Sequence, residues 1–211
     1  MHIWFLLILL LLNVGCSDNH SASNTTSLHT FLGREASLPA VYRAKVPSEW
    51  IRRDPDATTN LNDTTQPICT FFIGDIKITI HNFPADSSEK RIPPSAQVER
   101  WKRQFAVLNP LESFSTPQAY AGYFGLQFEG TGVISEIPTT TLAWAMQMDP
   151  RHYSNLTAKQ QYHPKEKGYL QQMAADYTIK AMGPPESMAE HRDAIVNFAH
   201  SFELIQEIPA S

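Results

Sequence analysis

The chain has 211 residues, of which 42% are hydrophobic, and this is enough apolar material for the core of a single globular domain. Its 17 Lys and Arg residues against 21 Asp and Glu residues give a net charge of −4. Because the basic residues form no clustered patch, the composition argues against nucleic acid as the main partner.

The first 15 residues form an apolar segment that is too short to span a bilayer. As a helix, Ile3 to Gly15 covers roughly 20 Å, against ~30 Å of hydrocarbon. A run of this length that ends in small residues is typical of a signal peptide. Val14-Gly15-Cys16 resembles the lipobox of bacterial lipoproteins, although Asn13 stands where Leu is usual and the segment lacks Lys and Arg.

We therefore expect a lipoprotein signal peptide over residues 1–15, with cleavage before Cys16 and a diacylglycerol and palmitate on that cysteine. Two or three acyl chains hold a protein stably on a membrane, whereas one chain binds only marginally. The alternatives are an uncleaved anchor, or ordinary secretion in which Cys16 has no special role.

Residues 16–38 are expected to form a flexible tether, because residues 17–30 hold only two apolar side chains and cannot offset the entropy of ordering. A single folded domain is expected over residues 39–211. If Cys16 is acylated, Cys69 has no cysteine to pair with. The apolar run around Cys69 predicts a small buried side chain rather than a reactive thiol.

The first half of this domain predicts strands and one helix. Val41 to Val46 indicates a strand, Trp50 a core anchor, and Arg52 to Gln66 a loop. A hairpin follows, with strands over Ile68 to Ile73 and Ile76 to Phe83. The second strand alternates Ile76, Ile78 and Ile80 with Lys77, Thr79 and His81. Pro93-Pro94 then opens a helix that Ser95 is expected to cap, with one buried stripe made of Val98, Trp101 and Phe105.

The second half predicts three more strands and a closing helix. The strands are placed at Gln118 to Glu129, Thr140 to Met148 and Leu170 to Met182. The second of these has large apolar residues on one face and alanines on the other, which indicates a sheet covered on both sides. Ser187 to Glu190 has the spacing of a capping box for the last helix.

The polar segment between the last two of these strands, residues 149–168, is the preferred candidate for a binding feature. It carries His152 and His163, and it is predicted to be a short helix with turns or an exposed loop. The chain has no phosphate-binding glycine loop, no nucleophile elbow and no zinc-like spacing of ligands. We therefore expect no catalytic residues, no metal and no cofactor.

Four short motifs resemble a group of bacterial lipoproteins in the PsbP/Mog1 superfamily. They are Val46-Pro47-x-x-Trp50, Val98-x-Arg100-Trp101-x-x-Gln104-Phe105, Met182-Gly183-Pro184 and Phe198-x-x-Ser201-Phe202. The similarity covers about residues 40–206, and the whole chain also resembles a chlamydial lipoprotein. It implies an α+β fold with an antiparallel sheet of about six strands between helices. Members of the superfamily act mainly as protein-binding modules, and no functional residue of the family transfers to this chain.

The first hypothesis is therefore a non-catalytic protein-interaction module, lipid-anchored to the bacterial cell membrane on the outer-membrane or periplasmic side. The second is a small-ligand carrier or an enzyme with a site near the 149–168 segment. A third hypothesis is that host innate receptors sense the lipopeptide itself.

Overall fold

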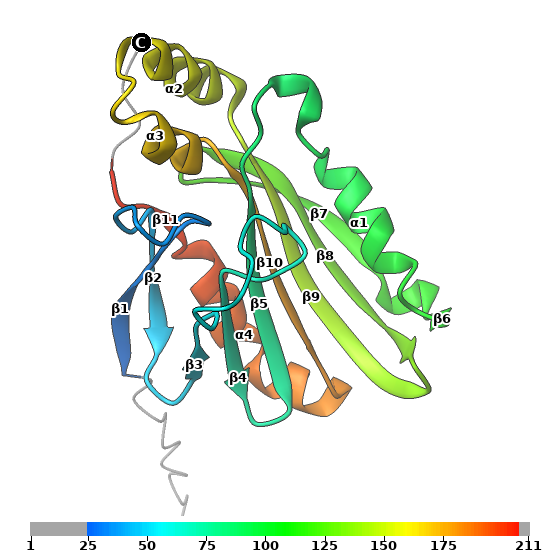
Figure 1. The fold of residues 1–211 in the computed structure, drawn as a ribbon. Helices are drawn as coiled ribbons and strands as arrows, with labels where there is room; N and C mark the ends of the chain where they lie inside the picture. Colours follow the sequence, from blue (N-terminus) through cyan, green and yellow to red (C-terminus); the bar gives the residue numbers. More distant parts are fainter. Residues whose placement is uncertain (1–24, 207–211) are drawn as a thin grey trace, which may run out of the picture.

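The computed structural model describes residues 25–206, whose elements are drawn in Figure 1. The strands are β1 (Thr26–Phe31), β2 (Tyr42–Pro47), β3 (Ile51–Arg53), β4 (Cys69–Ile73), β5 (Ile76–Phe83), β6 (Val107–Leu108), β7 (Phe114–Tyr120), β8 (Tyr123–Ile134), β9 (Ile137–Met148), β10 (Asp176–Gly183) and β11 (Glu203–Leu204). The helices are α1 (Pro94–Lys102), α2 (Pro150–Tyr162), α3 (Lys167–Met173) and α4 (Pro185–His200), with short 3-10 helices η1 (Ser88–Lys90) and η2 (Pro110–Glu112).

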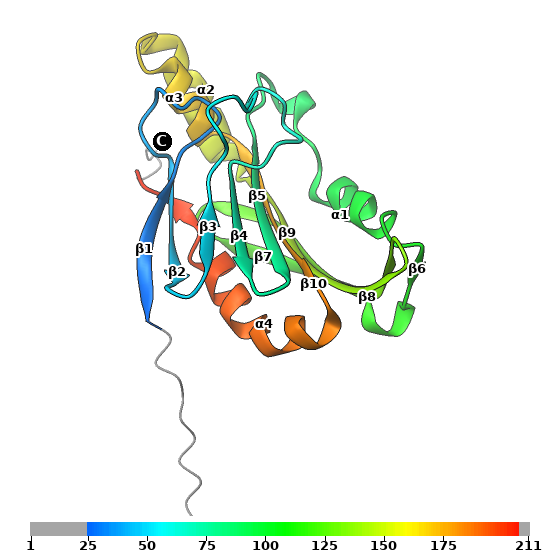
Figure 2. The same cartoon turned by 60° about the horizontal axis from the view of Figure 1, so that its bottom comes forward.

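The centre of the fold is an eight-stranded antiparallel sheet in the order β3-β4-β5-β10-β9-β8-β6, with β7 also pairing with β8. A smaller sheet has the order β1-β2-β11. Helix α1 packs against β8 and β9 on one face of the large sheet, and α4 packs against β9 and β10 on the other (Figures 1 and 2). The predicted α+β fold with an antiparallel sheet between helices is confirmed, although the sheet is larger than six strands.

Strand β9 shows why helices cover both faces of this sheet. Leu142, Trp144 and Met146 lie in the main core, which also contains the buried side chains of α4. The intervening Ala143 and Ala145 lie in a second cluster. It also contains Val98 and Trp101 of α1 and Phe105 just after it, the three residues of the predicted buried stripe. The small alanines let α1 approach the sheet closely, as the alternation predicted.

The predicted hairpin is confirmed as β4 and β5. Ile76, Ile78 and Ile80 are fully buried on one face of β5. Thr79 and His81 lie on the opposite face and are only half-buried. The turn contains Gly74 at φ 54°, a left-handed conformation that glycine adopts without steric cost. Trp50 and Cys69 are buried, as predicted.

The prediction of a flexible tether over residues 16–38 is wrong for the part that the structure describes. Strand β1 lies within that range and pairs with β2 from Thr26↔Pro47 to Phe31↔Tyr42. The Phe31 ring is buried and lies 5.4 Å from the Phe202 ring. Pairing with β2 and packing against aromatic residues far along the chain stabilise a segment whose own composition is polar, so the folded domain includes Thr26 to Leu38 as well.

Two further boundaries differ from prediction. The segment predicted as one strand, Gln118 to Glu129, contains the turn between β7 and β8, in which Ala121 and Gly122 both have positive φ. Leu170 to Met173 belongs to α3, so the last long strand begins only at Asp176.

The two predicted helix caps are also wrong, because each helix begins earlier than expected. Pro93 is the N-cap residue of α1, and Ser95 therefore lies inside the first turn. Pro184 is the N-cap residue of α4, which places Ser187 within that helix. In both cases a proline at the first helical position, with φ already near the helical value, starts the helix without a side-chain cap.

The predicted signal peptide over residues 1–15 and the predicted lipid attachment at Cys16 lie outside the described residues. Within residues 25–206, none of the helices is long and apolar enough to cross a membrane.

Candidate functional site

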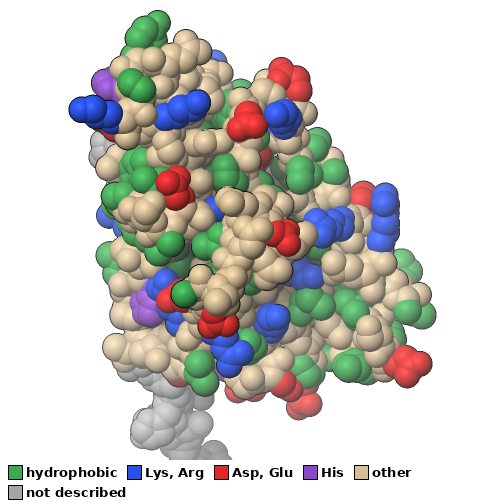
Figure 3. Space-filling view, in the orientation of Figure 1, with side chains coloured by type: hydrophobic (Ala, Val, Ile, Leu, Met, Phe, Trp, Pro, Cys, Tyr) green, Lys and Arg blue, Asp and Glu red, His purple; other side chains and the backbone are tan. Residues whose placement is uncertain are grey.

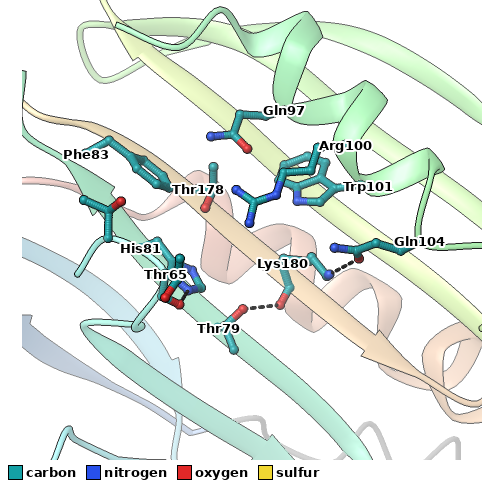
Figure 4. A pocket seen from close by; sticks show the side chains of 11 residues that line it. Thr65, Thr79, His81, Phe83, Gln97, Arg100, Trp101, Gln104, Thr178 and Lys180 are labelled. Atoms are coloured by element: carbon teal, nitrogen blue, oxygen red, sulfur yellow. Dashed lines mark hydrogen bonds between the residues drawn. The ribbon is translucent and has the colours of Figure 1, made fainter. Parts of the chain in front are cut away.

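A polar cleft lies where α1, β5, β10 and the loop before β4 meet, and we call it the α1 cleft. Its volume is about 170 Å³. Figure 4 shows side chains from all four segments pointing toward the same space. The cleft is lined by Thr64, Thr65, Thr79, His81, Phe83, Gln97, Arg100, Trp101, Gln104, Thr178 and Lys180.

The floor of the α1 cleft follows from strand alternation. In the antiparallel pairing of β5 with β10, Thr79 lies opposite Lys180 and His81 lies opposite Thr178. The alternating isoleucines point the other way, into the main core. Because α1 packs over β8 and β9, this polar strip of β5 and β10 stays accessible beside the helix.

The side chains that α1 contributes come from successive turns of the helix and the residues just after it. Gln97, Arg100, Trp101 and Gln104 have spacings of three and four, which places them on one stripe. The family-like motif therefore lies along the cleft. At the end of this motif, Gln104 Oε1 accepts a hydrogen bond of 2.6 Å from Lys180 Nζ.

The charges of the α1 cleft are of one sign. No Asp or Glu is among the described side chains that line it. Burial, together with the nearby Arg100 and Lys77, lowers the pKa of Lys180 to about 8. Burial also lowers the pKa of His81 to about 4, so this imidazole is neutral at pH 7, and its Nε2–H donates to Thr65 O at 3.2 Å.

Arg100 adds a guanidinium to this site. Within residues 25–206 it forms no ion pair, although neighbouring Glu99 is paired with Lys102 at 2.8 Å. Several Lys and Arg side chains lie along α1 and over the strands beside it (Figure 3). The cleft therefore holds Lys180 and Arg100 close together with no described counter-charge in its lining, an arrangement that favours an anionic group.

The loop wall of the α1 cleft is held by a buried arginine, Arg34. Its guanidinium donates to five backbone carbonyls, namely Asn82 O at 2.7 Å, Leu61 O at 2.8 Å, Asp63 O at 3.1 Å, Thr64 O at 3.2 Å and Gln66 O at 3.1 Å. Burial lowers the pKa of Arg34 to about 10, and the side chain stays protonated at neutral pH. Arg34 therefore fixes residues 61–66 against the end of β5.

The predicted binding segment over residues 149–168 is mostly helical, and its two histidines do not come together with the α1 cleft. His152 lines an open hollow of about 410 Å³ between the β7–β8 turn and the start of α2. His163 caps the far end of α2 and is exposed. Of the two alternatives for this segment, the helix is correct. Within residues 25–206, no group of three His, Cys, Asp or Glu side chains could hold a metal ion.

Neither Lys180 nor Arg34 stood out in the sequence as a site residue. The available signal was the alternation of β5, which placed Thr79 and His81 on the face away from the core. Arg100 is exposed on α1, and no pattern in the sequence indicates that β10 lies beside that helix.

Comparison with known proteins shows which architecture the fold resembles. No family model matches the chain, and no curated protein is similar to it in sequence. The structure is similar to the solution structure of cyanobacterial PsbP (CyanoP) from Synechocystis sp. PCC 6803, with a TM-score of 0.50 and 10% identity over 89% of this chain and 97% of that one. The fold is PsbP-like.

Two further solved structures are similar at lower scores. LpqN, involved in cell envelope biogenesis of Mycobacterium tuberculosis, has a TM-score of 0.46 and 9% identity over 88% of this chain and 87% of that one. PA94 from Pseudomonas aeruginosa, a protein of unknown function, has a TM-score of 0.41 and 9% identity over 88% of this chain and 99% of that one. The PsbP-like likeness concerns architecture, so function has to be argued from this chain's own residues.

Proposed function

We propose that this PsbP-like protein is a non-catalytic protein-interaction module of the bacterial envelope, held on a membrane by a lipid on Cys16, and that the partner docks at the α1 cleft. The main support for this docking site is the pair of cations, Lys180 and Arg100, beside a strip of polar side chains. The described lining of the α1 cleft contains no Asp or Glu. A partner that brings an anionic group gains charge-assisted hydrogen bonds at this position.

The architecture also supports binding rather than chemistry at the α1 cleft. Its polar groups are threonine hydroxyls, glutamine amides and two cations, which recognise a ligand by hydrogen bonding. His81, the side chain with the usual properties of a general base, donates to a backbone carbonyl, and burial keeps its pKa at about 4. A base with so low a pKa is weakly basic at neutral pH.

The lipid anchor is tested by the substitution Cys16→Ser. We expect the wild-type protein to partition with membranes and to incorporate labelled palmitate, whereas the variant is released and unlabelled, because serine offers no thiol for acylation. Fractionation and metabolic labelling measure both. Cys69→Ser is the matched control and should stay membrane-bound, since Cys69 is buried in the domain core. A Cys16→Ser variant that remains bound and labelled would contradict the anchor.

The docking site is tested by photo-crosslinking in the native cell. A photoreactive amino acid at Thr64, on the exposed rim of the α1 cleft, should give a discrete crosslinked protein. The same amino acid at Glu190, exposed on α4 at the opposite face of the sheet, is the control. Equal crosslinking from both positions, or crosslinking from Glu190 alone, would rule out docking at the cleft.

A small-ligand carrier is the second candidate function, and one observation favours it. A volume of about 170 Å³ is similar to that of an engineered cavity of ~150 Å³ that binds benzene, so a small organic acid fits without a protein attached. Copurification of such an acid with the wild-type protein, and no crosslinked protein from Thr64, would favour the carrier over the interaction module.

A further inference from the structure

The chemistry of the α1 cleft identifies the group that it receives. We infer that the cleft binds a carboxylate, an Asp or Glu side chain or the chain end of the docking protein, between Arg100 and Lys180. This inference names the ligand of the proposed docking site and rests on that function.

The donors of the cleft suit a carboxylate in kind and number. Arg100 extends from α1 toward β10, and Lys180 points across the same space to Gln104 (Figure 4). An arginine fork with a lysine at its side can satisfy both oxygens of a carboxylate through charge-assisted bonds. The hydroxyl of Thr178 and the amide of Gln97 lie in the same lining and offer further donors.

The described lining of the α1 cleft lacks one feature that is common in phosphate sites, the N-terminus of a helix. Phosphate sites commonly use the free backbone N–H groups of a helix N-terminus. Helix α1 begins with Pro94, preceded by Pro93, and it lines the cleft with side chains from its later turns. The donors proposed for the carboxylate are side chains of α1 and β10, with no contribution from the start of the helix.

The charge balance gives this inference a pH dependence. Lys180 is faced by Arg100 from α1 and by Lys77 from β5, and both lower its pKa, whereas Gln104 and the neutral His81 bring no charge at pH 7. Because the pKa of Lys180 is about 8, the ammonium is present below that pH and is lost above it. A bound carboxylate favours the ammonium, so binding should be strong at pH 7, weaken as the pH rises through about 8, and take up a proton near that pH.

The test uses succinate, inorganic phosphate and chloride as probes at matched ionic strength, with binding followed by amide chemical shifts. We expect saturable millimolar binding of succinate near Arg100 and Lys180, weaker binding of phosphate, and none of chloride. Raising the pH from 7 to 9.5 should weaken the succinate affinity by about tenfold.

Three variants sharpen the test. Lys180→Met should weaken succinate binding by about tenfold at pH 7, and Lys180→Arg should retain binding but lose the pH dependence, because arginine stays charged. Lys45→Met, at an exposed position on β2, should behave as wild type. Amide spectra of each variant establish that it is folded.

The outcomes separate this inference from the proposed function. No succinate binding, or tighter binding of phosphate than of succinate, would overturn the carboxylate assignment even where Thr64 crosslinks to a protein. Succinate binding with the expected pH profile supports the carboxylate site, and the absence of a crosslink would then count against the docking function alone.

Discussion

Replacing Asp176 by Asn should destabilise the domain by about 3–5 kcal/mol, because it leaves the Arg91 guanidinium buried without a counter-charge. The two side chains are 6% and 8% exposed, and Arg91 Nη2 lies 2.6 Å from Asp176 Oδ1. Asp176 Oδ1 also accepts from the backbone N–H of Met148 at 2.9 Å, and Arg91 donates to Met148 O at 2.6 Å. The pair therefore joins the start of β10, the end of β9 and the segment before α1.

Chemical denaturation with a linear extrapolation measures this loss, and the melting temperature should fall by about 10 °C. Asp193→Asn is the matched control, since Asp193 is 96% exposed and lies 4.0 Å from Arg192, and its effect should stay within about 0.5 kcal/mol. An Asp176→Asn variant as stable as this control would show that the ion pair contributes little to the fold.

Replacing Arg34 by Met should destabilise the domain by about 3 kcal/mol and also abolish carboxylate binding at the α1 cleft. Methionine fills much of the space but offers no donor, so five backbone carbonyls lose their bonds. The carbonyl of Asn82 is the most severe case, because this residue is fully buried. Hydrogen exchange should rise in residues 61–66, since Arg34 is what fixes that loop.

Arg43→Met is the appropriate comparison for this substitution. Arg43 is paired with Glu203 at 2.7 Å, but the two side chains are 41% and 45% exposed, so the loss should be below about 1 kcal/mol. If the Arg34 variant keeps both its stability and slow exchange in residues 61–66, the loop is held by its own contacts, and Arg34 is not a positioning residue of the cleft.

Much of the fold could be predicted from local patterns, because these patterns reflect single elements. The alternation of β5, the alanines of β9 and the prolines before α1 and α4 each carry their signal within a few residues. The strand β1 has no such signal. Its stability comes from pairing with β2 and from the burial of Phe31 against Phe202, and composition cannot reveal contacts between segments so distant in the chain.

The candidate site was harder to predict for the same reason. Lys180 and Arg100 are separated by most of the second half of the chain, and only the pairing of β5 with β10 and the packing of α1 bring them together. His152 and His163 stood out because the segment around them is polar, but His152 is half-buried at the start of α2 and His163 is exposed just after its end, both away from the α1 cleft. Arg34 lies in the segment that was predicted to be a flexible tether, although its guanidinium holds the loop of residues 61–66 beside the α1 cleft.

Because β1 begins at Thr26, the linker between the folded domain and its proposed lipid anchor is short. Only residues 17–25 separate Cys16 from Thr26, and a fully extended chain of that length reaches about 35 Å. The beginning of β1 lies at the opposite end of the molecule from α2 and α3 (Figures 1 and 2). With the lipid on Cys16, the start of β1 would stay within about 35 Å of the bilayer, and the exposed Tyr162 and His163 lie at the other end of the domain from this attachment.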